Sequence, residues 1–335
     1  MLYGVKDLRI EDITKPKVNY GEILVKVKAA TTCGTDLKIY QRGYVEGVIK
    51  LPTVFGHEWA GDVAEVGEGV SFFTKGMRVR GGNSSPCLRC YMCQRGKFNL
   101  CEDMMWLWGA YAEYIKVPAS NVLKLPSNLP FEQACILGCA VSTAYHALKR
   151  GRIHAGDTVV IYGIGGLGAH AIPLARIFKA EKVIAVDISD EKLKLAKKLG
   201  VDEIVNPATE DPAERLGEMT EGKLADLVLD FVGAAKVIEQ EIRCVGKGGR
   251  MVLVGIGPDD IRVSPYKTII GKEMELIGVN DHLRSELAQL VDMVGSGRID
   301  LSASVTHRVH LDEVNTGLSI LEEGTGNPIR VVIVK

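Results

Sequence analysis

Four cysteines that lie close together form the most specific chemical pattern of the chain. Their spacing is C-x2-C-x2-C-x7-C, and they are Cys87, Cys90, Cys93 and Cys101. Four thiolates on one compact loop can surround Zn²⁺ tetrahedrally and leave no position open for a substrate. A [4Fe-4S] cluster is less suitable, because the bacterial cluster motif places its fourth cysteine closer and follows it with proline, whereas Glu102 follows here. The spacing therefore predicts a structural zinc site in a lobe over residues 84–103.

A second set of metal-binding side chains is dispersed along the sequence. Cys33 lies in Cys-Gly-Thr-Asp, His57 directly precedes Glu58, and Cys139 lies in Leu-Gly-Cys-Ala-Val-Ser-Thr. Two thiolates and an imidazole are a chemically sensible set of three protein ligands, with a fourth position for water or substrate, as a catalytic zinc requires. Spacing alone cannot establish this site, because a single cysteine is more often a small buried core residue. The core interpretation stays open for these positions, and we assign Cys135 to the core.

A glycine-rich turn is the third pattern. Gly163-Ile164-Gly165-Gly166-Leu167-Gly168 follows an apolar strand and leads into a helical stretch over residues 169–178. In G-x-G-x-x-G the first glycine permits a tight turn, the second lets the backbone approach a pyrophosphate and the third allows close helix packing. Asp187 follows nineteen residues after Gly168, at the end of the next strand, where a carboxylate accepts both ribose hydroxyls and repels a 2′-phosphate.

Together these features predict a dinucleotide site that prefers NAD to NADP. The alternative is a turn that only packs tightly, with Asp187 capping a strand. The backbone residues expected at the cofactor are Gly163, Gly165, Gly166, Leu167 and Gly168.

Two different patterns of predicted secondary structure carry these residues. Up to about residue 125, short β-branched runs such as 22–28 alternate with glycine and proline turns, which is typical of antiparallel β structure. From about residue 157, continuous apolar strands alternate with helices, which indicates a parallel sheet covered on both faces. The C-terminal stretch, ending in the apolar run 330–334, again has a strand and turn pattern. A chain of 335 residues is long enough for two domains.

Composition excludes several classes of protein. Apolar residues make up 46%, and 41 basic against 42 acidic side chains give a net charge of −1. This balance provides no electrostatic reason to expect nucleic acid or an anionic membrane as partner. The sequence opens without the pattern of a secretory signal, and the uncharged stretch 158–175 contains glycines and a proline that argue against a membrane span. We therefore expect a cytoplasmic protein whose cysteines do not form disulfides.

With these elements in this order, the chain resembles the zinc-containing medium-chain dehydrogenase/reductase family of alcohol, polyol and threonine dehydrogenases. The resemblance extends over essentially the whole sequence. It implies an α/β plus β fold, with a GroES-like catalytic domain built from residues 1–140 and 281–335. A Rossmann NAD-binding domain, with a doubly wound parallel sheet, is expected over residues 141–280.

The resemblance assigns roles around the catalytic metal. Cys33, His57 and Cys139 match the catalytic zinc ligands, and Cys139 stands where polyol and threonine enzymes carry a carboxylate, which favours the alcohol dehydrogenase type of site. Glu58 resembles the family glutamate that can approach the metal when water or substrate leaves. Asp36 resembles the carboxylate that orients the ligand histidine, with a surface turn residue as the alternative.

Other positions match family residues around the substrate and cofactor. Thr35 matches the hydroxyl that hydrogen-bonds the substrate oxygen, and Thr143 matches a residue packed near the nicotinamide ring. Arg330 resembles a basic residue near the pyrophosphate, although a solvated arginine at a strand end fits the sequence nearly as well. Lys192, five residues after Asp187, is similar to the lysine that accompanies the adenosine ribose in NAD-linked members.

Two features depart from the family. Lys38 stands five residues after Cys33, where many relatives carry a histidine that relays the alcohol proton to solvent. Lysine, with an ordinary pKa of about 10.4, is a poor base at neutral pH, so the relay would end at water or start from another group. The bulky run 104–108 contains two tryptophans, which either line a short aromatic pocket or only pack in the core.

The resemblance implies a zinc-dependent oxidoreductase that transfers a hydride between a primary, secondary or polyol alcohol and NAD, giving an aldehyde or ketone. Its cofactors would be NAD and two Zn²⁺ ions per chain, and its partner a small-molecule alcohol or carbonyl compound. Relatives are dimers or tetramers paired through the last Rossmann strand, here about residues 274–279, so we expect a homo-oligomer. The alternatives are an enoyl- or quinone-type reductase of the same fold and a non-catalytic protein that binds NAD and zinc.

Overall fold

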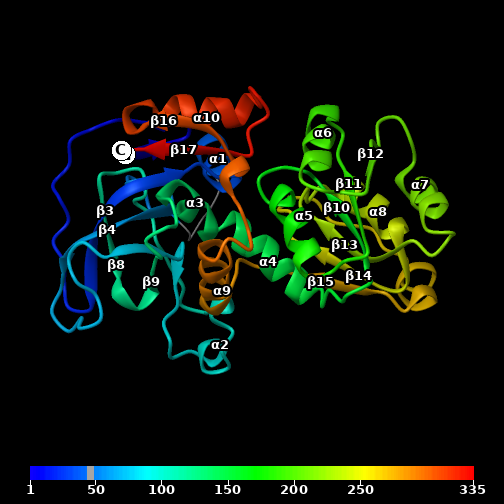
Figure 1. Cartoon of the computed structure of the whole chain (residues 1–335), viewed down its shortest axis with the longest axis horizontal. Helices are drawn as coiled ribbons and strands as arrows, with labels where there is room; N and C mark the ends of the chain where they lie inside the picture. The colour runs from blue at the N-terminus through cyan, green and yellow to red at the C-terminus, as the bar shows by residue number, and fades with distance from the viewer. Residues whose placement is uncertain (44–48) are drawn as a thin grey trace. The chain divides into compact units, whose positions relative to one another are not determined.

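The computed structural model describes residues 1–43 and 49–335 and divides the chain into two compact units. The first unit contains residues 1–142 and 282–335, and the second contains residues 143–281 (Figure 1). The first unit is therefore built from both parts of the chain that flank the second.

The first unit is organised around one large sheet. Its strand order is β16-β17-β3-β4-β5-β9, and β8 pairs with β3 off this path. All described pairings in it are antiparallel except that of β16 with β17. The strands are β3 (Glu22–Thr31), β4 (Glu58–Val66), β5 (Arg78–Gly81), β8 (Tyr114–Pro118), β9 (Val122–Lys124), β16 (Val305–His310) and β17 (Arg330–Val334). Figure 1 shows β17, in red, beside the blue strand β3 of the N-terminal part.

Helices and two small ladders complete the first unit. The ladders pair β1 (Leu2–Gly4) with β2 (Asp7–Leu8) and β6 (Ser84–Ser85) with β7 (Met105–Trp106). The α-helices are α1 (Gly34–Arg42), α2 (Tyr91–Gln94), α3 (Phe131–Cys135), α9 (Arg284–Gly295) and α10 (Val314–Glu323). Short 3-10 helices are Phe98–Leu100, Ala119–Asn121, Ile136–Gly138, Ser302–Ser304 and Leu311–Glu313. The helix α4 (Ala140–Arg150) begins in this unit and continues into the second.

The strand and turn expectation for the C-terminal part is incomplete, because α9 and α10 also lie there. In α9 the buried residues Leu287, Leu290, Val291 and Val294 recur every three or four positions. This spacing is a helical period, and it places one apolar stripe of α9 in the interior. The strand interpretation of this region overlooked that period.

The second unit is a parallel sheet covered by helices, as expected. Its strand order is β12-β11-β10-β13-β14-β15, and every pairing is parallel. The strands are β10 (Thr158–Tyr162), β11 (Lys182–Val186), β12 (Glu203–Val205), β13 (Ala225–Asp230), β14 (Val245–Leu253) and β15 (Glu275–Gly278). The helices are α5 (Gly168–Ile177), α6 (Asp190–Lys198), α7 (Pro212–Met219) and α8 (Ala235–Cys244), with a π-helical turn at Pro265–Ile270. Buried β-branched residues such as Val159, Val160 and Ile161 make β10 apolar on both faces.

Among the residues that the structure describes, no helix combines the length and apolar character needed to span a bilayer.

A buried carboxyl pair lies inside the second unit, where sequence patterns gave no sign of it. Glu241 on α8 and Asp230 at the end of β13 are both inaccessible to solvent. Asp230 accepts hydrogen bonds from the backbone N–H groups of Val232 and Gly233. Burial, followed by the charge of Asp230, raises the pKa of Glu241 to about 10. Glu241 is therefore protonated at neutral pH in the folded chain.

We expect Glu241 to lower the free energy of unfolding as pH rises between about 4.5 and 10, and Glu241→Gln to remove this contribution. The folded chain keeps the Glu241 proton up to about pH 10, whereas the unfolded chain loses it near the ordinary glutamate pKa of 4.5. The folded state thus binds more protons in this window, and one such group contributes at most about 1.4 kcal/mol per pH unit.

Denaturant titrations of wild type and variant at several pH values measure this slope. The groups facing Glu241 include Asp230, Tyr162 and Cys244, so the comparison with wild type is needed to isolate its share. Glu239→Gln, the same change on the same helix, is the matched control. An unchanged slope in the Glu241→Gln variant would contradict the buried neutral carboxyl.

Candidate active site and metal centres

The sheet of the first unit brings the dispersed metal-binding residues together. Cys33 follows β3, His57 directly precedes β4, Glu58 is its first residue, and Cys139 lies between the helix 136–138 and α4. Because β3 and β4 pair with Thr31 opposite Glu58, the segments that carry Cys33 and His57 lie side by side. Ligand atoms of these four residues all lie within 4.8 Å of one another, and the two sulfurs are 3.8 Å apart.

The ring of His57 is oriented by Asp36. The Nδ1 atom of His57 lies 2.9 Å from Oδ1 of Asp36, and both side chains are buried. A carboxylate partner makes Nδ1 the protonated nitrogen, which leaves Nε2 available for a metal. Asp36 also accepts a hydrogen bond of 2.9 Å from the backbone N–H of Cys33. The surface turn interpretation of Asp36 is therefore wrong, because this carboxylate is fully buried between two candidate ligands.

Arg330 also lies inside the first unit. Its guanidinium donates to Oε1 of Glu58 at 3.1 Å and to the backbone carbonyl of Thr32 at 3.1 Å. Only 2% of the Arg330 side chain is exposed, so the solvated interpretation is wrong. A position at the cofactor pyrophosphate stays a prediction. The charge of Arg330 enters the same buried cluster as the candidate ligands.

The electrostatics of this cluster favour an ionised sulfur at Cys33, whereas the hydrogen bond to Cys33 and burial raise the pKa of Cys139. A hydrogen bond from Cys139, together with the hydrogen bond and charge of His57, holds the pKa of Cys33 well below its usual range despite burial. Thiolate is the form in which cysteine binds metals. Burial raises the pKa of Glu58 to about 8, although the charge of Arg330 opposes this shift. The cluster therefore combines a thiolate with a carboxyl that readily holds a proton.

The donor set fits a zinc ion. Two sulfurs, one imidazole nitrogen and a nearby carboxylate oxygen are ligands that zinc accepts in tetrahedral sites. Oε2 of Glu58 is buried and has no hydrogen-bond partner among the described residues, which leaves an acceptor directed into protein where a cation can satisfy it. With Cys33, His57 and Cys139 as ligands, the fourth position remains for substrate, water or Glu58.

Further residues surround this cluster. Thr35 lies half-buried in the first turn of α1, two residues after Cys33, and Lys38 lies half-buried one turn further along. Trp108 packs edge-on against His57 with ring centroids 5.3 Å apart and stacks on Phe55 at 5.5 Å. Trp108 thus packs against a candidate ligand, and its role in a substrate pocket stays a prediction.

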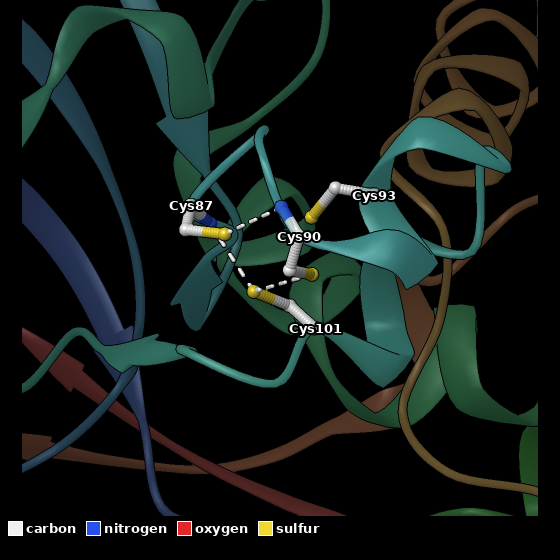
Figure 2. Close-up of side chains that lie close together, drawn as sticks. All are labelled: Cys87, Cys90, Cys93 and Cys101. Atoms are coloured by element: carbon white, nitrogen blue, oxygen red, sulfur yellow. Dashed lines mark hydrogen bonds between the residues drawn. The ribbon is translucent and has the colours of Figure 1, made fainter.

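The four clustered cysteines converge in their own lobe. Cys93 lies on α2, Cys90 precedes it, Cys87 lies on the incoming loop and Cys101 follows the turn 98–100 (Figure 2). Their sulfurs face one another and lie within 4.8 Å. Backbone N–H groups of Cys87 and Cys90 donate to the sulfurs of Cys101 and Cys87, respectively. This closed arrangement of four sulfurs fits a structural zinc ion.

Charge within the lobe is unevenly distributed. Backbone N–H donors lower the pKa of Cys90 to about 6, whereas burial raises the pKa of Cys93 to about 12. Cys90 is thus a thiolate at neutral pH in the folded lobe. Backbone N–H donors also lower the pKa of Cys87, so the lobe favours the thiolate, the metal-binding form, at both cysteines.

The glycine turn has the geometry expected for a pyrophosphate cradle. Gly163 has φ of +82°, which favours glycine, and a Cβ at Gly168 would lie 2.0 Å from the carbonyl oxygen of Gly163. A Cβ at Gly165 would meet nothing within 4 Å, so the space beside it is open to a ligand. Gly166 and Leu167 complete the turn before α5, whose N-terminus carries a positive partial charge.

Asp187 lies directly after β11, as predicted, and its side chain also hydrogen-bonds the glycine turn. Its Oδ2 accepts from the backbone N–H of Ile164 at 2.7 Å, and its Oδ1 accepts from Ser189 at 2.9 Å. Lys192 lies in the first turn of α6, half-buried, and Thr143 lies buried on α4 at the beginning of the second unit. Their roles at the cofactor stay predictions.

Sequence reasoning missed Tyr111. Its hydroxyl donates a hydrogen bond of 2.8 Å to Oδ2 of Asp36, and the residue is buried. Tyr111 belongs to no motif that we recognised, and it is separated from Asp36 by 75 residues. Only the folded arrangement reveals this contact.

Comparison with known proteins agrees with this geometry. Residues 19–127 match the family described as alcohol dehydrogenase GroES-like domain, and residues 166–296 match the family described as zinc-binding dehydrogenase. An alcohol dehydrogenase of Geobacillus stearothermophilus is 37% identical over 92% of this chain and 92% of its own length. The chain belongs to the zinc-type medium-chain dehydrogenase family.

Other members of the zinc-type medium-chain dehydrogenases are similarly related. An L-threonine 3-dehydrogenase of Pyrococcus horikoshii is 35% identical over 91% of this chain and 88% of its own length. The solved structure of an alcohol dehydrogenase from Thermus sp. ATN1 superposes with a TM-score of 0.93 at 29% identity, covering 99% of this chain and 98% of that one. The expected fold, GroES-like and Rossmann, is confirmed.

Proposed function

We propose that this chain catalyses the reversible oxidation of a small-molecule alcohol to an aldehyde or ketone with NAD. As a zinc-type medium-chain dehydrogenase it is an oxidoreductase that acts on CH–OH donors. The convergence of Cys33, His57 and Cys139 within 4.8 Å, next to Glu58, is the observation that carries the proposal. Three protein ligands leave one position for the substrate oxygen.

The residues of the first unit divide the work of this reaction. When bound, zinc supplies a Lewis acid and the nicotinamide supplies a hydride acceptor. Asp36 fixes the tautomer and orientation of His57. Thr35, two residues after Cys33, offers a hydroxyl that can accept the alcohol proton while passing on its own. Burial of Cys33, His57 and Asp36 excludes water and strengthens every electrostatic contact at the site.

The cofactor assignment rests on the second unit. Open space beside Gly165 leaves the backbone after β10 accessible to a pyrophosphate. Gly168 lets α5 begin close against the carbonyl of Gly163. Asp187 places a carboxylate at the end of β11, where it would accept the ribose hydroxyls. Lys192, Thr143 and Arg330 are proposed as further cofactor contacts.

We expect Asp187→Asn to shift cofactor preference towards NADP. The substitution removes a negative charge that repels a 2′-phosphate, and it weakens charged hydrogen bonds to the ribose. Such bonds are worth about 1.5–3 kcal/mol, so the ratio of kcat/KM for NAD over NADP should fall about 10- to 100-fold. Steady-state kinetics with both cofactors measure the ratio. Asp190→Asn, an equal change of charge on the nearby α6, is the control, and equal ratios in the two variants would refute the role of Asp187.

The proposed function is tested with the purified, zinc-loaded chain. Reduction of NAD is followed with a panel of primary, secondary and vicinal diol alcohols, and enoyl and quinone substrates are offered with NADH. Alcohol-dependent NADH formation that stops on chelation supports the proposal. Turnover of activated double bonds alone indicates the reductase alternative, and zinc and NAD binding without any turnover indicates a non-catalytic protein.

We further propose that the chain forms a cytoplasmic homo-oligomer, a dimer or tetramer, through the edge strand β15. This strand terminates the parallel sheet and carries the exposed apolar side chain of Leu276, and Ile270, five residues before the strand begins, is exposed as well. An open edge with apolar neighbours favours pairing with a second copy. The eight cysteines are free, which suits a reducing compartment. Sedimentation analysis measures the oligomeric state.

A further inference from the structure

The loop that carries Tyr111 is bound to the segment that carries His57. The backbone N–H groups of Gly109 and Ala110 donate to the carbonyl of Gly56 at 2.9 and 3.0 Å, and that of Tyr111 donates to the carbonyl of Phe55 at 2.9 Å. These three bonds hold residues 109–111 against the two residues that precede His57. Any shift of one segment would therefore move the other.

Gly56 makes room for the Tyr111 side chain. Its φ is +80°, and a Cβ at this position would lie 2.4 Å from a ring carbon of Tyr111. Phe55 contacts the same ring edge-on, with centroids 5.8 Å apart. The Tyr111 ring thus packs directly on the backbone of Gly56, the residue before His57, and Phe55 contacts it as well.

The hydroxyl of Tyr111 ends at the carboxylate that orients His57. It donates to Oδ2 of Asp36 at 2.8 Å, while its distance to the carbonyl of Thr31 is 3.4 Å, so Asp36 is the better acceptor. Oδ2 also receives the Cys33 backbone N–H at 2.9 Å, and Oδ1 pairs with His57 at 2.9 Å. Asp36 thereby joins the backbone of one candidate ligand to the ring of another, and Tyr111 is the side chain that fixes Asp36 from behind.

Nothing in this arrangement lets Tyr111 act on a substrate directly. Its ring lies in the apolar core of the first unit, and its hydroxyl is buried against Asp36. Burial and the charge of Asp36 hold the pKa of the phenol well above its usual range, so it remains a donor at all ordinary pH values. Its influence on the reaction has to pass through Asp36.

We propose that Tyr111 is a positioning residue of the catalytic metal centre, whose hydroxyl locks the Asp36 carboxylate and, through it, the metal-binding orientation of His57. This inference rests on the proposed function only in assuming that Cys33, His57 and Cys139 bind zinc. Groups that support a metal-binding histidine typically change metal affinity or activity 10- to 100-fold when removed. Tyr111 is one step further from the metal, so we place its effect at the lower end.

The test measures zinc release rather than activity. Zinc-loaded protein is mixed with excess chelator and a chromogenic zinc indicator, and release is followed in time. Wild type should lose one zinc from the dispersed site and one from the four-cysteine lobe. The phase that is missing in a Cys139→Ala variant identifies the dispersed site. In Tyr111→Phe this phase should be about tenfold faster, while the phase from the lobe stays unchanged.

A matched control removes another buried phenol hydroxyl. Tyr162 lies in the second unit and hydrogen-bonds the sulfur of Cys244 at 3.0 Å. Tyr162→Phe should therefore leave both phases of zinc release at their wild-type rates. The unchanged lobe phase in Tyr111→Phe reports in the same experiment that the first unit is still folded.

A double substitution distinguishes action through Asp36 from simple packing. In an Asp36→Ala background, Tyr111→Phe should accelerate release less than twofold further, because the acceptor of its hydrogen bond is gone. Independent, multiplying effects would overturn the proposal, as would an unchanged release rate in the single variant Tyr111→Phe. If wild type itself binds zinc only in the four-cysteine lobe, the proposed function fails instead, so the two failures are distinguishable.

Discussion

Cys139→Ala should abolish alcohol oxidation and lower the zinc content from two ions per chain to one. The substitution removes one of three ligands whose donor atoms lie within 4.8 Å, and it leaves the lobe of Cys87, Cys90, Cys93 and Cys101 intact. A metal that polarises a reacting oxygen lowers the barrier by several kcal/mol, and about 1.4 kcal/mol corresponds to a factor of ten. We therefore expect kcat/KM to fall at least about 1,000-fold.

The chain itself offers a close control for this experiment. Cys135 is a second buried thiol four residues earlier, and its sulfur donates to the backbone carbonyl of Glu132, outside the ligand cluster. Cys135→Ala should keep two zinc ions and wild-type kinetics. Atomic emission measures the zinc content of each variant. Binding of NADH, followed by fluorescence, shows whether the cofactor site survives. Retention of two zinc ions and of turnover in Cys139→Ala would refute the assigned centre.

Cys90→Ala should destabilise the first unit strongly. Structural zinc sites in zinc-finger peptides contribute about 10–16 kcal/mol of binding free energy. Loss of only 3–4 kcal/mol would lower Tm by about 10 °C, since about 1 kcal/mol shifts Tm by 2–4 °C in chains of 150–250 residues. Calorimetry measures the change in Tm, and limited proteolysis should yield new cleavage within residues 84–103.

The neighbouring Gln94 provides the comparison for the lobe. It is exposed on α2, the short helix that Cys90 precedes, and its side-chain amide donates to the carbonyl of Arg89 without entering the sulfur cluster. Gln94→Ala should keep the wild-type Tm within about 1–2 °C, because surface substitutions usually cost at most about 0.5 kcal/mol. A Cys90→Ala variant as stable as Gln94→Ala would show that the lobe does not depend on its metal.

Local spacing predicted two features of the molecule well. The four cysteines lie within fifteen residues, so a short loop had to bring them near one another. The turn from Gly163 to Gly168 lies between an apolar strand and a helix, and its steric demands appear in the structure at Gly163 and Gly168. In both cases the pattern and the geometry occupy the same short stretch of chain.

Long-range contacts could not be predicted in this way. Cys33, His57 and Cys139 meet because β3 pairs with β4 and a short helix ends beside them. Their side-chain chemistry and the resemblance to a family suggested the set, but their spacing could not establish it. Arg330 fits a solvated strand end by sequence, yet it is buried against Glu58, 272 positions away. Tyr111 and Glu241 belong to no sequence motif, because only the packing of the folded chain brings them next to Asp36 and Asp230.

The pairing of β17 with β3 has a consequence for synthesis on the ribosome. The carbonyl of Val331 accepts a hydrogen bond from the backbone N–H of Thr32, next to Cys33. The part of the sheet that supports Cys33 is therefore incomplete until residues 330–334 emerge. Cys101 completes its lobe 229 residues earlier than Arg330 is made. At about 5–20 residues per second, this interval lasts roughly 10–45 s. A nascent chain can thus take up its first ion before its second, which has to wait until residues 330–334 have emerged.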